Sequence, residues 1–212
     1  MQKPELSKLR KNYNSGELNE SNLTVDPFKQ FEIWFNEVLS NDKLEANAMV
    51  LSTVSKNLSP SSRFVLLKDY SEKGFVFFTN YNSKKGKEIE GNKNVALLFF
   101  WPSLERQVRI EGTIKKTSAK ISDEYFYSRP VESQASAIIS EQSTVINDYN
   151  NLVIQQQETL INNILKRPEN WGGYIVTPIL FEFWQGRINR LHDRIQYRFE
   201  KNKSWKIERL SP

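Results

Sequence analysis

Lysines are concentrated at one predicted helix start. The segment Asn80-Tyr81-Asn82-Ser83-Lys84-Lys85-Gly86-Lys87 leaves an apolar strand and enters a short helix. The N-terminus of a helix carries partial positive charge, so lysines there are unfavourable unless an anion lies in front of them. Backbone N–H groups, together with Lys84 and Lys85, could bind a phosphate through charge-assisted hydrogen bonds of roughly 1.5–3 kcal/mol each. The alternative is a solvated basic turn without a ligand.

A second group of cations lies near the C-terminus, in Arg190-Leu191-His192-Asp193-Arg194. If this segment is a β-strand, Arg190, His192 and Arg194 lie on one face, because side chains alternate along a strand. Trp184 precedes them across a predicted hairpin and could offer an aromatic surface. Cations beside a flat aromatic ring suit a planar, phosphorylated ligand. A basic surface strand with a structural histidine is the alternative.

Two cations enclose the apolar run Phe64-Val65-Leu66-Leu67. Arg63 and Lys68 are five residues apart, so on an ideal strand they point to opposite faces. They can share one pocket only if the strand bulges or ends at Lys68. Two solvated strand ends are the simpler alternative.

Tyr125, Arg129 and Ser133 are spaced by four residues, as in a helical stripe. Pro130 interrupts that stripe and favours an extended conformation at Arg129. We therefore expect the three side chains to meet around a helix end. The alternative is a helix stop with a surface arginine.

The elements that must position these residues follow from the apolar and turn patterns. Asp26-Pro27 predicts a helix start, and the apolar residues of 28–38 recur at helical spacing on a core-facing side. Strands are predicted at 48–54, 63–68, 75–79, 95–101, 107–115, 174–177, 181–184, 190–198 and 205–209, and helices near 118–127, 134–140 and 146–165. Short connections indicate antiparallel hairpins. The predicted fold class is mainly β with α: an antiparallel barrel with peripheral helices.

Composition limits both fold and function. The 212 residues, 38% of them hydrophobic, can form a core. We expect residues 1–22 to be a flexible N-terminal arm and residues 23–212 a single domain. Zero cysteines exclude disulfides and thiolate catalysis, and one histidine leaves no histidine cluster for a metal.

The charge and hydropathy of the chain bear on its partners. The net charge of +5 favours anionic ligands, but the cations are dispersed and no nucleic-acid motif is present. No apolar run reaches the roughly 20 residues of a membrane span, and no secretory signal is recognisable. The net charge by itself suits nucleic acid, a membrane surface or a small phosphorylated ligand and does not choose among them. We expect a cytoplasmic protein that binds neither nucleic acid nor a membrane.

Read in order, these segments resemble the pyridoxamine 5′-phosphate oxidase family from about Leu9 to Pro212. The most specific part is the C-terminal stretch, with Phe183-Trp184-Gln185-Gly186, Arg190-Leu191-His192-Asp193-Arg194 and Trp205-Lys206-Ile207-Glu208-Arg209-Leu210-Ser211-Pro212. Supporting fragments are Arg63–Lys68, Leu104-Glu105-Arg106-Gln107-Val108, Tyr125-Phe126, Ser128-Arg129-Pro130, Ser133-Gln134 and Gln142-Ser143. The resemblance implies an FMN-binding split β-barrel and a homodimer with FMN at the subunit interface. It also implies oxidation of pyridoxamine or pyridoxine 5′-phosphate to pyridoxal 5′-phosphate by oxygen, with release of hydrogen peroxide.

The resemblance also assigns roles to residues. The implied FMN contacts are Arg63, Phe64, Val65, Leu66, Leu67, Lys68, Phe78, Thr79, Lys84, Lys85, Gln107, Gln142, Ser143, Trp184 and Arg194. The implied substrate contacts are Lys68, Tyr125, Arg129, Ser133, Arg190 and His192, with Arg190 and His192 as the catalytic pair and Arg10 and Tyr13 as arm residues that cover the site. No metal is expected.

Two positions depart from the family pattern, and one alternative function is left open. Phe78 stands where the family commonly has tyrosine, and Lys84 where it commonly has arginine, so a hydroxyl and a bidentate fork are lost. The alternative is a split-barrel module that binds flavin without catalysis. Arg190 and His192 argue against it, because a flavin carrier has no need of a substrate clamp.

Overall fold

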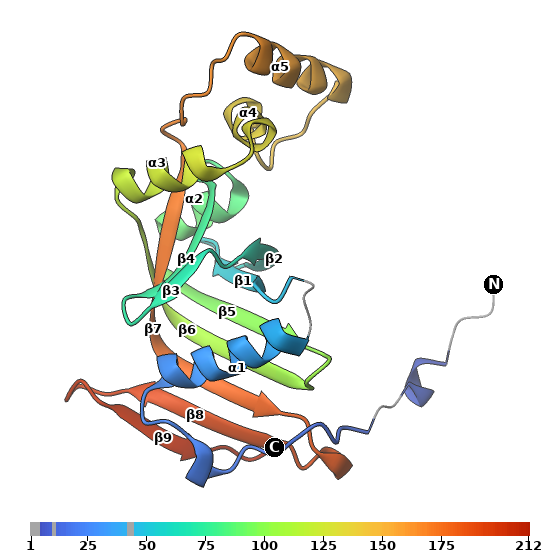
Figure 1. Cartoon of the computed structure of the whole chain (residues 1–212), viewed down its shortest axis with the longest axis vertical. Coiled ribbons are helices and arrows are strands. Elements are labelled where there is room, and N and C mark those ends of the chain that lie inside the picture. The colour runs from blue at the N-terminus through green and yellow to red at the C-terminus, as the bar shows by residue number, and fades with distance from the viewer. Residues whose placement is uncertain (1–4, 10–11, 42–44) are drawn as a thin grey trace. The chain divides into compact units, whose positions relative to one another are not determined.

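The computed structural model describes residues 5–9, 12–41 and 45–212, and Figure 1 shows the order of their elements. The helices are η1 (Leu6–Lys8), η2 (Glu20–Asn22), α1 (Pro27–Asn41), α2 (Lys84–Gly91), α3 (Ala119–Ser128), α4 (Val131–Ile139), α5 (Tyr149–Ile161) and η3 (Ile188–Arg190). The strands are β1 (Ala48–Val54), β2 (Pro60–Leu66), β3 (Asp69–Ser71), β4 (Gly74–Asn80), β5 (Asn94–Trp101), β6 (Arg106–Lys116), β7 (Trp171–Gln185), β8 (Asp193–Phe199) and β9 (Trp205–Arg209).

The strands of the described residues form one nine-stranded sheet with the order β2-β1-β5-β6-β7-β4-β3, in which β8 pairs with β7 and β9. The pairings of β1 with β2, β3 with β4, β7 with β4 and β8, and β8 with β9 are antiparallel. The predicted combination of antiparallel strands and helices is therefore confirmed. Within the described ranges, the structure contains no helix with the length and hydropathy of a membrane span.

Residue contacts divide the chain into two compact units, and β5, β6 and β7 contribute residues to both. Unit 1 comprises residues 1–46, 98–110 and 179–212, as far as they are described. Its core lies under α1, where the ring of Phe31 is 5.1 Å from that of Phe99 and the ring of Trp34 is 5.2 Å from that of Phe183. Such aromatic pairs stabilise a core by about 0.5–1.5 kcal/mol beyond their buried area. The predicted core-facing side of this helix is confirmed.

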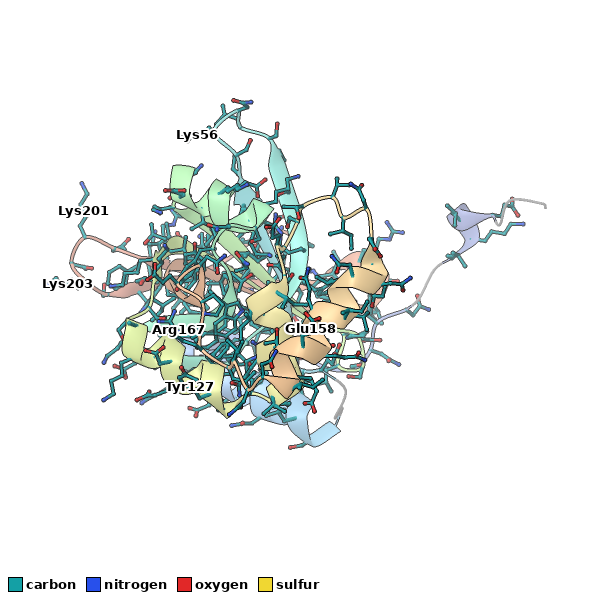
Figure 2. The ribbon with its side chains drawn as sticks, turned by 90° about the horizontal axis from the view of Figure 1, so that it is seen from above. Lys56, Tyr127, Glu158, Arg167, Lys201 and Lys203 are labelled. Carbon is teal, nitrogen blue, oxygen red and sulfur yellow. The ribbon has the colours of Figure 1, made fainter. Side chains whose placement is uncertain are left out.

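Unit 2 comprises residues 47–97 and 111–178. Its α4 and α5 lie side by side (Figure 1), and the side-chain amide of Gln156 on α5 donates to Ser136 on α4 at 2.6 Å. Arg167, which is labelled in Figure 2, donates to Asp123 of α3 at 2.6 Å and to the carbonyl oxygen of Trp171 at 2.7 Å. The arginine thus fixes the start of β7 to α3.

The boundaries of the predicted strands near the C-terminus differ from those in the structure. The predicted strands 174–177 and 181–184 are parts of one strand, β7, which continues through Pro178. Its pairing with β4 ends at Val176 and its pairing with β8 begins at Leu180, so the missing N–H of the proline falls between the two pairings.

The predicted strand 190–198 begins only at Asp193. Asn189 (φ 55°) and Arg190 (φ 62°) adopt the left-handed conformation, which turns the chain before β8 starts. The three-residue β3 was not predicted.

Candidate functional site

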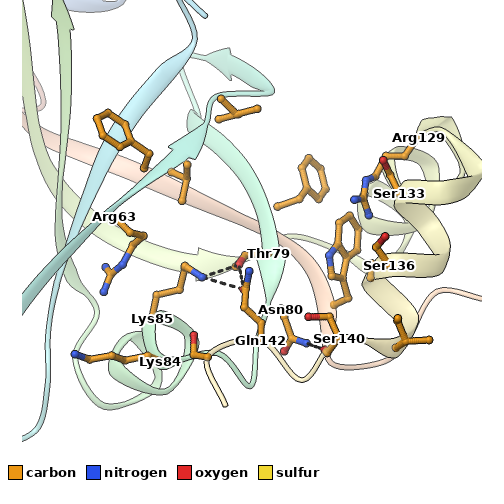
Figure 3. A pocket seen from close by; sticks show the side chains of 18 of the residues that line it. Arg63, Thr79, Asn80, Lys84, Lys85, Arg129, Ser133, Ser136, Ser140 and Gln142 are labelled. Atoms are coloured by element: carbon orange, nitrogen blue, oxygen red, sulfur yellow. Dashed lines mark hydrogen bonds between the residues drawn. The ribbon is translucent and has the colours of Figure 1, made fainter. Parts of the chain in front are cut away.

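Unit 2 contains a cleft of about 1100 Å³ that gathers most of the predicted ligand residues. Five cationic side chains line it, and none of its lining residues, all of which are described, is an aspartate or glutamate. These cations are Arg63, Lys68, Lys84, Lys85 and Arg129. Figure 3 shows four of them around the cleft, at opposite ends of which lie the Arg63-Lys85 group and the Arg129-Ser133 group. An excess of positive charge without a carboxylate suits anionic ligands.

The predicted basic helix start lies at one end of this cleft. Ser83 caps α2 by accepting a hydrogen bond from the N–H of Gly86, as a serine at an N-cap commonly does. Lys85 follows in the first turn and is only 8% exposed. Its Nζ donates to the side-chain oxygen of Gln142 at 2.9 Å and to the hydroxyl of Thr79 at 3.3 Å, as Figure 3 shows. The structure thus brings together three residues that the resemblance implies as FMN contacts.

Burial changes the acidity of Lys85. Desolvation is the main cause that lowers its pKa, the charge of Arg63 lowers it further, and Glu88 acts in the opposite direction, with a resulting pKa of about 8. Among the described residues, the acceptors of the ammonium group are the neutral oxygens of Thr79, Ser83 and Gln142. A bound anion would relieve this cost, because an opposite charge nearby favours the protonated form.

Arg63 is held at the same end of the cleft by a buried carboxylate. Glu88, 7% exposed, accepts hydrogen bonds from Thr53 at 2.5 Å, Ser61 at 2.7 Å and Arg63 at 3.1 Å. Burial raises the pKa of Glu88, but the three hydrogen bonds and the charge of Arg63 outweigh it and lower the pKa overall. The carboxylate remains ionised and fixes the guanidinium beside the cleft.

A second group of predicted ligand residues, here called the clamp, lies at the junction of α3 and α4 and consists of Lys68, Tyr125, Arg129 and Ser133. Arg129 caps α3 in an extended conformation (φ −78°, ψ 153°), and Pro130 caps α4. Tyr125, Arg129 and Ser133 all line the cleft, so the prediction that they meet around a helix end is confirmed. Lys68 joins them, because β2 ends at Leu66 and the Lys68 ammonium lies 5.9 Å from the Tyr125 ring.

Arg129 has an unused hydrogen-bonding group. Its guanidinium lies 4.8 Å from the ring centre of Trp171, while its Nη1 is buried and has no hydrogen-bond partner within the described part of the chain. Burial lowers the pKa of Arg129, and the nearby Tyr125 opposes that effect. A buried donor without a partner costs about 1–3 kcal/mol. A phosphate oxygen in the cleft would remove that cost.

Aromatic rings form the wall behind this clamp. Phe78 stacks on Tyr125 with 3.9 Å between ring centres, and Trp171 lies 5.8 Å from Phe78. Phe78 keeps its place in the stack without the hydroxyl that is common at this position. The cleft therefore combines flat apolar surface with cations at both ends, as a planar phosphorylated ligand requires.

The low pKa of Lys85 predicts how the ligand-free protein responds to pH. Between about pH 8 and 10.5 the unfolded chain keeps a proton that the folded chain has lost, so the contribution of Lys85 to the free energy of unfolding rises with pH in that window. Below about pH 8 the buried charge costs on the order of 1–2 kcal/mol after solvent screening. We expect Lys85→Met to be more stable than the parent at pH 7 in urea unfolding, with a difference that shrinks towards pH 10. Lys87→Met, on the exposed side of α2, is the control. Equal free energies of unfolding for the parent and Lys85→Met at pH 7 would contradict the prediction.

Unit 1 holds the second predicted cluster. The rings of Trp184 and His192 lie 4.7 Å apart, and Trp184 pairs with Arg194 across β7 and β8. The Nδ1 atom of His192 accepts the backbone N–H of Arg187 at 3.1 Å, so its Nε2 carries the proton in the neutral ring. Burial and the charge of Arg190 lower the pKa of His192, against an opposing effect of Asp193. At neutral pH the ring is a neutral donor.

The predicted common strand face for Arg190, His192 and Arg194 is wrong. Arg190 lies in η3 with a positive φ and is exposed, and His192 lies in the loop before β8. Arg194 is on β8, where it donates to the buried Glu182 at 2.8 Å and to the carbonyl oxygen of Ser211 at 2.9 Å. The left-handed turn, not the alternation of a strand, places Arg190 near His192.

The remaining predicted residues fall into three groups. Phe64, Val65, Leu66 and Ser143 line the cleft of unit 2, whereas Leu67 is buried and is not part of its lining. Gln107 is on β6 within unit 1. Tyr13 contacts both Trp184 and His192 with ring centres 5.7 Å away, and Arg10 lies outside the described residues.

Several cleft residues were not predicted. Trp171 supports Arg129, and Tyr149, Leu152, Val153 and Gln156 line the cleft from α5. The apolar residues of α5 repeat at helical spacing, which predicts the helix but not the side on which a ligand would lie. Trp171 could have been identified from the sequence, because an aromatic residue beside two glycines at the start of a strand suggests a close approach of another group.

Comparison with known proteins gives consistent similarities. Residues 36–162 match a family model described as pyridoxamine 5′-phosphate oxidase, and residues 171–212 match one described as the pyridoxine 5′-phosphate oxidase C-terminal dimerisation region. A pyridoxine/pyridoxamine 5′-phosphate oxidase of Flavobacterium johnsoniae is 52% identical over 211 residues, which cover 98% of this chain and 99% of the relative.

Two solved structures extend the similarity to the fold. PhzG from Burkholderia lata, in complex with tetrahydrophenazine-1-carboxylic acid, has a TM-score of 0.87 and 26% identity and covers 91% of this chain and 95% of its own. A pyridoxamine 5′-phosphate oxidase-related, FMN binding protein from Nostoc punctiforme has a TM-score of 0.72 and 14% identity. The match covers 90% of this chain and 100% of the Nostoc chain. Together with the antiparallel sheet, this similarity confirms the predicted fold class, a split barrel with peripheral helices.

Proposed function

Because the chain belongs to the pyridoxamine 5′-phosphate oxidase family, we propose that the cleft of unit 2 is where it binds its flavin and its phosphorylated substrate. The protein is a homodimeric, FMN-dependent oxidase. It converts pyridoxamine or pyridoxine 5′-phosphate to pyridoxal 5′-phosphate, with oxygen as electron acceptor and hydrogen peroxide as the second product. The observation that supports the assignment of the site is the gathering of five cations, without a carboxylate, around one cleft with an aromatic wall.

The residues at the α2 end fit the phosphate of FMN. Lys85 is buried against neutral oxygens and its pKa is lowered, so a dianion beside it would restore the protonated form. Arg63, oriented by Glu88, and the backbone start of α2 add donors, while Lys84, Gln142 and Ser143 line the same end. FMN supplies the redox chemistry when bound: it takes up a hydride from the substrate and passes electrons to oxygen.

The residues at the other end fit the phosphate of the substrate. Arg129 has a buried Nη1 that needs an acceptor, and Tyr125, Ser133 and Lys68 place two hydroxyls and an ammonium beside it. Charge-assisted bonds from arginine to phosphate are among the strongest that a protein makes. This clamp fixes one end of the pyridine ring, and Phe78 with Trp171 provides an apolar wall.

Arg190 and His192 are the proposed catalytic pair. The neutral His192 can donate from Nε2 to an oxygen of the pyridine substrate, because its Nδ1 is engaged by the backbone of Arg187. Burial is the main cause that lowers the pKa of His192, the charge of Arg190 adds to it, and Arg190 can contact the substrate from the exposed turn. Both residues, with Trp184 and Arg194, are proposed to complete the site in the homodimer.

Replacement of Arg190 tests this pair. We expect Arg190→Gln to lower kcat/KM about tenfold to a hundredfold while FMN remains bound, since one charge-assisted contact to the substrate is lost. Without the arginine the pKa of His192 rises, so the acidic limb of the kcat/KM profile should move to higher pH. Arg198→Gln, on the exposed part of β8, is the matched control. An unchanged kcat/KM and an unmoved acidic limb would remove Arg190 from the site.

A steady-state assay tests the proposed function as a whole. Protein reconstituted with FMN should form pyridoxal 5′-phosphate from pyridoxamine 5′-phosphate and release one hydrogen peroxide per product. A protein that binds FMN but forms no product would instead be a non-catalytic flavin module. We also propose a cytosolic location, with which a sequence without cysteines agrees.

A further inference from the structure

Glu105 is a buried carboxylate that neither phosphate site uses. It lies between β5 and β6, is 2% exposed and has a positive φ of 54°. Its Oε2 accepts the backbone N–H of Asn14 at 2.7 Å and that of Ser15 at 2.9 Å. Its backbone oxygen accepts the N–H of Gly186 at 2.8 Å. One residue therefore joins the N-terminal segment to the end of β7 that carries Trp184.

The residue before these two amides is Tyr13. Its ring meets Trp184 edge-on (88°) and His192 at 73°, each with 5.7 Å between ring centres. It also lies directly on Gly186: a Cβ atom there would be 2.8 Å from the Cγ of Tyr13. The glycine thus makes room for the tyrosine, and the tyrosine ring covers one side of the histidine.

We propose that Glu105 is a positioning residue that holds Tyr13 against His192 and Trp184, and so acts on the reaction through the arm. The inference rests on the proposed function, in which His192 faces the substrate. Two hydrogen bonds from amides to one buried carboxylate are strong and fix the direction of the backbone.

Further polar contacts hold the residues after Ser15. Arg187 donates to the carbonyl oxygen of Gly16 at 3.5 Å and pairs with Glu17 at 3.0 Å. The N–H of Leu18 donates to Asp193 at 3.1 Å, and Arg209 donates to the carbonyl oxygen of Leu18 at 2.9 Å. These bonds fix the segment five residues after Tyr13. Glu105 is the residue that binds the backbone of the two residues after the tyrosine, so its replacement should loosen Tyr13 while the segment from Gly16 onward stays docked.

Glu105→Gln tests the carboxylate with little change in volume. Both N–H groups donate to one oxygen, Oε2, and the amide oxygen of glutamine can take its place; because that oxygen is uncharged, the two charge-assisted bonds to the arm weaken. We expect kcat/KM for pyridoxamine 5′-phosphate to fall roughly tenfold, with FMN content unchanged. Glu37→Gln, which removes the carboxylate paired with Arg106 in the same unit, should leave kcat/KM unchanged and controls for the loss of charge.

The arm offers an independent variant that leaves Glu105 intact. Ser15→Pro removes one of the two N–H donors, whereas Ser15→Ala keeps it. Both Glu105→Gln and Ser15→Pro should speed chymotrypsin cleavage after Tyr13, in holoenzyme without substrate. Ser15→Ala should be cleaved at the parent rate. This readout does not depend on turnover, and it separates a freed arm from an unfolded protein, which would be cleaved throughout.

A double-mutant cycle decides whether Glu105 acts through Tyr13. If it does, Glu105→Gln lowers kcat/KM in the parent but has no further effect in Tyr13→Ala. The same fold-loss in both backgrounds would overturn the proposal, as would parent-like proteolysis and kcat/KM in Glu105→Gln. If the parent itself forms no product from pyridoxamine 5′-phosphate, the proposed function fails; the proteolysis pattern then still tests the tie between Glu105 and the arm.

Discussion

Arg129→Ala should raise the KM for pyridoxamine 5′-phosphate about a hundredfold or more and leave FMN bound. The guanidinium lies at the end of the cleft away from α2, and its buried Nη1 has no hydrogen-bond partner among the residues that the structure describes. Loss of an arginine that binds a phosphate with two hydrogen bonds costs about 3 kcal/mol, which corresponds to the expected change. The measurement is a pair of titrations: steady-state kinetics with substrate, and flavin fluorescence for FMN affinity.

Two variants control for charge and geometry at Arg129. Lys120→Ala removes one positive charge from an exposed position of α3 and should behave as the parent. Arg129→Lys keeps the charge but loses the planar fork, so its KM should lie between those of the parent and the alanine variant. If Arg129→Ala lost FMN as readily as substrate, the assignment of the two ends of the cleft to two phosphates would be wrong.

Lys85→Met should weaken FMN binding at least a hundredfold. The lysine is buried at the start of α2, and its ammonium group is held by neutral oxygens that leave it free to pair with a phosphate. Removal of that charge forfeits a charge-assisted bond in a poorly solvated place, on the order of 3 kcal/mol. Because the same variant is expected to stabilise the ligand-free protein, binding and stability should change in opposite directions.

The effect of Lys85 can be checked by reconstitution of the apoprotein. Parent, Lys85→Met and the exposed control Lys87→Met are titrated with FMN at pH 7 and at pH 9. The affinity of the parent should fall as pH rises above about 8, the pKa of Lys85 in the absence of ligand. FMN affinity of Lys85→Met close to that of the parent would show that the phosphate does not bind at this end.

The basic helix start could be predicted because all its signals are local. Ser83 is a favourable N-cap, an apolar strand precedes it, and lysines in a first turn conflict with the helix dipole. That conflict is the local signal from which an anion site was predicted here. The meeting of Tyr125, Arg129 and Ser133 followed in the same way, because Pro130 restricts the residue before it.

The turn before β8 could not be predicted from the alternation of side chains along a strand. Asn189 tolerates the left-handed conformation, but nothing in the local pattern requires Arg190 to adopt it as well. The contact between Arg187 and His192, which closes this turn, depends on the folded loop. The prediction from strand alternation therefore began the strand three residues too early and placed Arg190 on a strand instead of in a turn.

Glu105 and Glu88 illustrate what depends on long-range contacts. Glu88 binds Arg63 and Thr53, which lie 25 and 35 residues away, and Glu105 binds the backbone of Asn14 at a separation of 91 residues. Glu88 lies in none of the fragments that carry the resemblance, and Glu105 lies in one of them, Leu104–Val108, without an implied role. Their functions follow from burial and from the donors around them, and these become visible only in the fold.

Anaerobic spectroscopy tests the central claim most directly. The protein is saturated with FMN, oxygen is removed, and pyridoxamine 5′-phosphate is added. We expect the yellow absorbance of the flavin to bleach, to return when air is admitted, and to persist far longer in Arg129→Ala at the same substrate concentration. A colourless protein that takes up no FMN, or a bound flavin whose spectrum the substrate leaves unchanged, would contradict the account.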